Sequence, residues 1–165
     1  MVKYSENDLD QALETGFINN VAFADWFLAK SKFSHLNAKY KWSRSDSPWG
    51  RFDFKLIDPD SGERLTEPRD SETDVLVTFE SDELTFALHI ENKRRDGHFT
   101  KFQVESYPLR AREWLNTEKF GNYSDFQTVL VAPIEFYGKN YQQAKGFDFF
   151  VSYEEISFFL EAFRN

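Results

Sequence analysis

Two carboxylates and a lysine stand at the ends of two neighbouring apolar segments. Asp74 is the second residue of "TDVLVTFE", Glu91 lies near the end of "LTFALHIEN", and Lys93 follows that segment directly. Mg²⁺ typically uses only one or two protein carboxylates, and this leaves room for water and a substrate phosphate. The residue types therefore suggest a divalent-cation site that could meet a phosphate group.

The positions of these three residues depend on a β-hairpin. A two-residue turn within "SDE" makes the numbers of opposed residues add up to 165, which sets Asp74 opposite Glu91. Side chains alternate between the faces of a strand, so His89 and Lys93 share the face of Glu91. A one-residue slip would turn one strand over, and the apolar pattern disfavours it. The opposite face is the predicted core and carries Val75, Val77, Phe79, Phe86, Leu88 and Ile90.

Two carboxylates at cross-strand distance repel each other by about 1 kcal/mol at partly exposed sites. A positive group should therefore lie between Asp74 and Glu91. One candidate is a divalent cation bound through oxygen ligands. The other is an ion-pair cluster in which Lys93 alone supplies the charge. The sequence leaves both open.

The elements that must hold this hairpin follow from periodicity, capping and turn signals. Their order predicts one α/β domain over 1–165, with a mixed central sheet flanked by helices. Pro108 should kink or interrupt the central helix, because it lacks an N–H group. The predicted elements are helices within 5–30, a strand at 51–57, a turn-rich stretch at 58–72, hairpin strands at 73–80 and 84–92, a helix at 100–116, a strand at 128–133 and a helix at 152–164.

Composition excludes several classes of protein. The 165 residues are 41% hydrophobic and include 19 Phe, enough apolar material for a single core. The absence of cysteine excludes disulfides, thiolate zinc sites and cysteine catalysis. The acidic start lacks an apolar leader region, and no apolar run approaches the roughly 18 to 20 residues of a membrane span. We expect a soluble, cytoplasmic protein with no membrane partner.

The charge distribution is uneven. A net charge of −8 argues against a protein that coats nucleic acid by charge alone. Segment 30–55, however, has seven Lys or Arg against two acids, with Trp and Tyr between them. Lys41 and Arg44 could contact a phosphate backbone there, while the aromatic residues stack on bases. The alternative is a solvated segment whose aromatic residues belong to the core.

The combination of Asp74, a hairpin, Glu91-x-Lys93 and Gln103-x-x-x-Tyr107 resembles the PD-(D/E)XK nuclease superfamily, in its branch with an ExK strand end. Thr73 stands where the pattern has proline. The resemblance covers about 50–132, with the helices of 5–30 as an N-terminal accompaniment. It implies a restriction-endonuclease-like αβββαβ core and metal-dependent hydrolysis of phosphodiester bonds.

The resemblance also implies roles for individual residues. Asp74 and Glu91 would bind Mg²⁺ or Mn²⁺, with the Asn92 backbone carbonyl as a further ligand. Lys93 would hold or deprotonate the attacking water, or stabilise charge on the phosphoryl group. Glu14 is the candidate for an additional metal ligand from the first helix.

Other candidate residues have structural explanations of equal interest. Gln103 belongs to the catalytic pattern, yet at the third helical position after Thr100 it could instead cap the helix. Tyr107 could contact nucleic acid or be a core aromatic with a solvated hydroxyl. Arg94 and Arg95 could bind phosphate or form a solvated turn.

The expected function is hydrolysis of nucleic acid, with DNA preferred over RNA as the partner. The alternative is a catalytically silent nuclease-fold module that binds a protein. Under either function, the partners could include another protein or a second copy of the chain in a homodimer.

Overall fold

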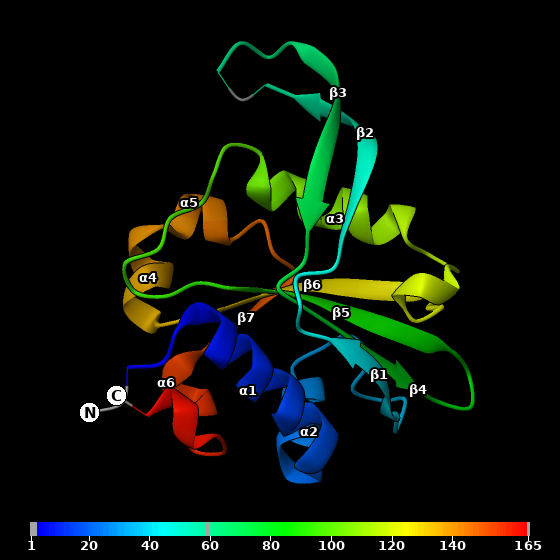
Figure 1. Ribbon diagram of the computed structural model, residues 1–165, viewed down its shortest axis with the longest axis vertical. Helices are drawn as coiled ribbons and strands as arrows, with labels where there is room; N and C mark the ends of the chain where they lie inside the picture. Colours follow the sequence, from blue (N-terminus) through cyan, green and yellow to red (C-terminus); the bar gives the residue numbers. More distant parts are fainter. Residues whose placement is uncertain (1–2, 59, 165) are drawn as a thin grey trace.

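The computed structural model describes residues 3–58 and 60–164, and at its centre is a five-stranded sheet in the order β1-β4-β5-β6-β7 (Figure 1). This confirms the prediction of an α/β fold with a mixed central sheet. The antiparallel strands are β1 (Lys39–Arg44), β4 (Val75–Glu80) and β5 (Thr85–Asn92), and the strands parallel to β5 are β6 (Asp125–Ala132) and β7 (Phe149–Ser152).

The β4–β5 hairpin has the predicted register. Val75 lies opposite Ile90, so the next position outward brings Asp74 to the level of Glu91. The predicted core face of the hairpin is fully buried. The other face is buried too, because aromatic residues beside α3 (Gln103–Glu113) cover it. Asp74 and Glu91 therefore lie at the edge of a sheet that is covered on both sides.

A second hairpin is inserted between β1 and β4. β2 (Trp49–Ile57) and β3 (Arg64–Glu72) form a separate two-stranded sheet that projects from the body of the molecule (Figure 1). The strand predicted at 51–57 exists, but it does not join the central sheet. The turn-rich prediction is wrong for β3, a polar segment whose backbone is satisfied by pairing with β2. An edge strand also tolerates a proline such as Pro68.

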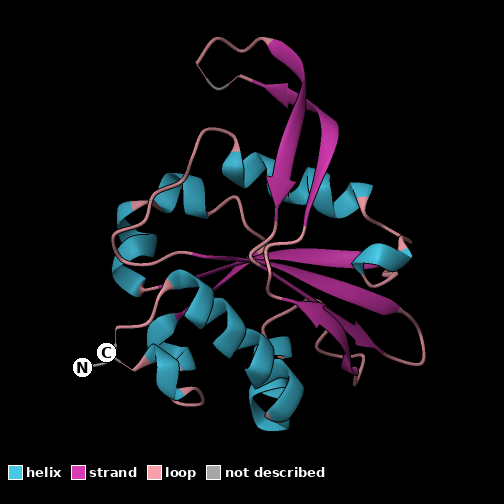
Figure 2. Cartoon of the chain, in the orientation of Figure 1, coloured by secondary structure: helices cyan, strands magenta, loops and turns pink. Residues whose placement is uncertain are grey.

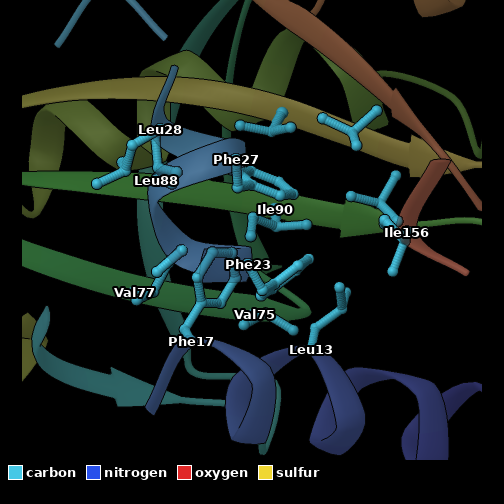
Figure 3. Close-up of a cluster of buried hydrophobic side chains, with 14 of the residues drawn as sticks. Leu13, Phe17, Phe23, Phe27, Leu28, Val75, Val77, Leu88, Ile90 and Ile156 are labelled. Atoms are coloured by element: carbon cyan, nitrogen blue, oxygen red, sulfur yellow. The ribbon is translucent and has the colours of Figure 1, made fainter. Parts of the chain in front are cut away.

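Two N-terminal helices cover one face of the sheet (Figures 1 and 2). α1 (Glu6–Asn19) begins at Ser5, which forms a capping box with Asp8. α2 (Val21–Leu28) begins at Asn20, whose side chain accepts the Phe23 N–H at 3.0 Å. Their apolar stripes meet the sheet in the main core shown in Figure 3, which includes Leu13, Phe17, Phe23, Phe27, Val77, Leu88 and Ile90.

α3 covers the opposite face and differs from its predicted form. It begins at Gln103 rather than Thr100, because Phe102 adopts a left-handed φ of 63° while its ring packs against the β2–β3 hairpin. Pro108 lies inside α3 and does not interrupt it. Short turns complete this side: η1 (Glu118–Phe120), α4 (Ile134–Lys139) and α5 (Tyr141–Ala144).

The C-terminal segment is not the single helix predicted over 152–164. Ser152 and Glu155 form the predicted capping box of α6 (Tyr153–Ile156), but the chain then turns and ends in η2 (Glu161–Phe163). Phe159 packs against Trp26 of α2, with 4.9 Å between the ring centroids. This tertiary contact, rather than helical periodicity, determines the course of the chain after α6. Within the described residues, no helix is both long and apolar enough to cross a membrane.

Candidate active site

The candidate site lies where β5 ends and β4 begins. Asp74 precedes β4, Glu91 and Asn92 close β5, and Lys93 follows. β5, β6 and β7 are parallel and end at the same edge, which is where α/β sheets commonly bind ligands. Asp74 is only 8% exposed and Glu91 only 2%. The carboxylate pair is thus almost enclosed.

Three donors hold the Glu91 carboxylate. The Lys93 ammonium lies 2.7 Å from Oε1, and the Gln103 side-chain amide donates to the same oxygen at 2.6 Å. The Tyr107 hydroxyl donates to Oε2. A buried carboxylate is unfavourable unless it is paired and hydrogen-bonded, and these contacts meet that need. Glu91 is therefore fixed in orientation from two sides.

The Asp74 carboxylate has fewer hydrogen-bond donors than Glu91. Its Oδ2 accepts the Asn92 N–H at 2.8 Å, and within the described chain no group donates a hydrogen bond to Oδ1. Burial, followed by the charges of Glu91 and Asp10, raises the pKa of Asp74 well above its ordinary value. Lys93 pairs with Glu91, so positive charge is short on the Asp74 side. A cation at this carboxylate would relieve the repulsion.

A third carboxylate near the pair comes from α1. Asp10 accepts a hydrogen bond from the Asn92 side-chain amide at 2.7 Å, and the Tyr153 hydroxyl donates to the Asn92 side-chain oxygen. Burial is the main cause that raises the pKa of Asp10 to about 7. Asp10 was not among the residues predicted from the sequence. One sequence signal could have identified Asp10, namely that this acidic residue lies on the same helix face as the apolar residues Leu13 and Phe17.

Glu14, the expected ligand from the first helix, lies elsewhere. It accepts hydrogen bonds from the hydroxyls of Ser43, at 2.6 Å, and Ser45, at the end of β1. Within the described residues, no group of three or more His, Asp or Glu is spaced to hold a metal ion. A cation would therefore depend on Asp74, Glu91, backbone oxygen and water.

Gln103 contacts both the loop before α3 and the Glu91 carboxylate. Its Oε1 accepts the Thr100 N–H at 3.0 Å, while its Nε2 donates to Glu91. Thr100 is not the helix cap that the sequence predicts, because Phe102 occupies the N-cap position and α3 begins at Gln103. Tyr107 lies one turn later, and its ring is buried while its hydroxyl reaches Glu91. Tyr107 therefore holds Glu91 through its hydroxyl, and its ring is almost fully buried.

The basic candidates are distributed around the molecule. Arg94 and Arg95 follow the site, within 3.8 Å of Asp96 and 3.3 Å of Glu135 respectively. The other two belong to β1. Arg44 lies near the site end of that strand and is bidentate with Asp46, whereas Lys41 lies toward the far end, beside Thr85 and Glu80. Exposed pairs of this kind are weak, because water and salt screen them, so they would not prevent phosphate contact.

A buried hydrogen-bond chain supports the backbone before Asp74. Arg110 donates from Nε to the Thr73 hydroxyl at 2.8 Å, and this hydroxyl meets His89 Nδ1 at 3.0 Å. His89 Nε2 meets the Tyr123 hydroxyl at 2.8 Å, which donates to the Ala111 carbonyl. His89 is therefore a satisfied interior residue.

A cavity of about 620 Å³ adjoins the site. Its walls are the β2–β3 hairpin, the loop from Lys93 to Phe102, and one face of α3. Lys93, Gln103 and Tyr107 all line it, so the groups that hold Glu91 also face this space. Its volume lies within the range of about 300 to 1,000 Å³ that is usual for ligand pockets.

Comparison of the chain with protein-family models, curated proteins and solved structures found no match. Geometry alone therefore supports a functional assignment. The fold brings together Asp74, Glu91, Lys93 and Gln103, while Glu14 and Lys41 lie apart from them.

Proposed function

We propose that the protein is a metal-dependent nuclease of the PD-(D/E)XK type, with a restriction-endonuclease-like core, that hydrolyses phosphodiester bonds in DNA. The buried Asp74–Glu91 pair, with Lys93 at the tip of β5, carries the proposal. The chain order of helix, three antiparallel strands, helix and parallel strand agrees with the αβββαβ arrangement that the sequence resemblance implies. β1 rather than β2 supplies the first of the three strands.

The residues present fit a hard divalent cation. Asp74 has an oxygen without a donor in the described chain, and burial, followed by the charges of Glu91 and Asp10, raises its pKa. Asp74 and Glu91 would hold Mg²⁺ or Mn²⁺, with the Asn92 carbonyl as a further candidate ligand. The metal, when bound, lowers the pKa of a coordinated water and stabilises charge on the phosphate.

The protein side chains have separate tasks. Lys93 lines the cavity beside Glu91, where its ammonium can hold the attacking water or bind a phosphate oxygen in the transition state. Gln103 and Tyr107 fix the Glu91 carboxylate through its two oxygens. Burial of the pair excludes bulk water and strengthens these interactions.

The first test measures cleavage of single-stranded DNA, duplex DNA and RNA with Mg²⁺ or Mn²⁺. We expect metal-dependent cleavage that falls by about 100-fold or more in Lys93→Ala, because positioned proton-transfer and charge-stabilising groups contribute on that scale. Lys32→Ala is the matched control. Lys32 pairs with Asp125 at the opposite end of the sheet, so its loss should leave the rate unchanged. Equal activity of Lys93→Ala and the parent would contradict the proposal.

A catalytically silent module that binds a protein is the alternative. The observation that favours it is the full set of protein donors on Glu91, which balances that carboxylate without a metal. Calorimetry separates the two. The nuclease proposal expects Mn²⁺ binding that disappears in Asp74→Ala, whereas a silent module shows neither metal binding nor cleavage.

A further inference from the structure

One buried cation beside the cavity has no task in the proposed reaction. Arg110 is 1% exposed, and it donates from Nε to Thr73 and from Nη1 to the Ser71 hydroxyl. Its third nitrogen, Nη2, is buried and has no acceptor in the described part of the chain. Buried polar groups are nearly always hydrogen-bonded, so this nitrogen calls for an acceptor.

In addition, no acidic side chain of the described residues balances the charge of Arg110 by direct contact. No carboxylate of the described residues lies within ion-pair distance of it, and its two acceptors are neutral hydroxyls. The rings of Tyr107 and Trp114 flank the guanidinium, with their centroids 4.0 and 5.8 Å from its central carbon. Burying a charge without a partner is unfavourable. An anion bound next to Arg110 would offset this unfavourable free energy by pairing with the guanidinium.

The adjoining cavity can hold such an anion. Arg110 and Ser71 line it together with Lys93. Two acids also line it, Asp70 and Glu72, but both are exposed residues of the hairpin, and Asp70 pairs with Arg51 at 3.2 Å. The interior wall of the cavity is therefore the basic one.

We propose that Arg110 and Lys93 make this cavity a binding site for a phosphate group of single-stranded nucleic acid, next to the phosphate that is cleaved. Trp49 lines the same cavity and is 60% exposed, so it offers a ring on which an unpaired base can stack. Bases in a duplex do not present their faces, and the cavity has the size of a small ligand rather than of a double helix. The inference rests on the proposed nuclease function and names its substrate as a single strand.

The test measures binding of a fluorescently labelled single-stranded oligonucleotide in EDTA, where no cleavage occurs. Ser71→Asp places a carboxylate on Arg110 and thus supplies internally the anion that the strand would provide. We expect binding to weaken by about tenfold or more, because hydrogen bonds to charged groups are strong. The melting temperature should stay the same or rise, since the buried charge gains a partner. In a plot of the logarithm of the binding constant against the logarithm of the salt concentration, the slope should become shallower by about 0.7 units. That is the value for one phosphate contact on a single strand.

Matched variants separate this inference from misfolding and from the nuclease proposal. Ser71→Ala loses the hydroxyl without adding charge and should retain most of the binding. Asp74→Asn should abolish cleavage and retain binding. If Ser71→Asp has a lower melting temperature than the parent, its weaker binding could come from misfolding, and Trp49→Ala is then the deciding variant. It removes only an exposed ring, so it should weaken binding without affecting the fold.

Competitors identify the ligand. Inorganic phosphate and a nucleoside monophosphate should compete weakly, and a duplex should compete less well than a single strand. Unchanged oligonucleotide binding in Ser71→Asp, or equal binding of duplex, would overturn the inference, whether or not the protein cleaves DNA.

Discussion

Gln103 shows how one side chain can satisfy a structural and a chemical requirement at once. Its amide oxygen accepts the Thr100 N–H and so holds the loop before α3, and its amide nitrogen restrains Glu91. An amide has a donor end and an acceptor end, so these two contacts fix its orientation. A carboxylate at this position would keep the contact with Thr100 and repel Glu91. The loop before α3 and the site geometry are therefore coupled through one residue.

His89 is constrained in a similar way. The Tyr123 hydroxyl donates its proton to the Ala111 carbonyl, so His89 Nε2–H must donate to Tyr123. His89 Nδ1 is then an acceptor for the Thr73 hydroxyl, and this chain of bonds requires a neutral ring. Burial, and then the charge of Arg110, lowers the pKa of His89 well below its ordinary value.

Stability should accordingly depend on pH through His89. The unfolded side chain binds a proton below about pH 6.5, whereas the folded one does not, so its contribution is complete above that pH and is lost as pH falls. Between pH 7.5 and 5.5 the loss is about 1.4 kcal/mol in the free energy of unfolding. Urea unfolding of the parent and of His89→Gln at pH 7.5 and 5.5 measures it. The same pH dependence in both proteins would refute this role.

At the scale of elements, the β2–β3 hairpin forms one wall of the cavity. Phe54 and Leu56 from its inner face are buried beside Phe102, at the start of α3. This docking leaves the hairpin's outer face exposed and its strands outside the central sheet. The wall is thus attached to the body through a small apolar cluster of its own.

Phe54→Ala should loosen this wall without unfolding the sheet. Removing a buried phenylalanine typically costs about 3 to 5 kcal/mol, and here the loss falls on the hairpin's own cluster. Hydrogen exchange should show faster exchange of β2 and β3 amides, while β5 and β6 keep their protection. Lys55→Ala, on the exposed face of the same strand, is the control. Equal loss of protection in β5 would show that the hairpin and the sheet unfold as one unit.

The sequence predicted those elements whose signals are local. Alternation and turn length specified the β4–β5 register, and this register alone located Asp74 opposite Glu91. β1 was not predicted, because its side chains are polar or only half-buried and its strand forms by pairing with β4. β3 was missed for the same reason. Asp10 and Arg110 join the site only through tertiary contacts, so residue spacing alone did not identify them.

At the scale of the whole molecule, the two faces of the sheet have different interiors. The face under α1 and α2 is an aromatic and aliphatic core, in which Phe17 lies 5.0 Å from both Phe23 and Phe27 between ring centroids. The face under α3 includes the polar chain through His89 and Arg110. The first face supplies stability, and the second orients the groups at the edge of the sheet.

Phe17→Ala should therefore destabilise the entire fold. We expect a loss of about 3 to 5 kcal/mol in the free energy of unfolding, because the ring is buried among other rings that cannot close the resulting cavity. Chemical denaturation followed by tryptophan fluorescence measures it. Ile57→Ala, at an exposed position of β2, is the control and should change stability by less than about 0.5 kcal/mol. A small effect of Phe17→Ala would mean that this face is not the main source of stability.

The inserted hairpin also has a consequence for the order of folding. β1 must pair with β4 across the whole insertion, and the entropy of closing a loop increases with its flexible length. When β2 and β3 pair, Trp49 comes opposite Glu72, and only a few residues then remain between the hairpin and each strand of the sheet. Local pairing is fast, whereas distant pairing is slow. We therefore expect the hairpin to form first and to bring the ends of β1 and β4 together before the sheet forms.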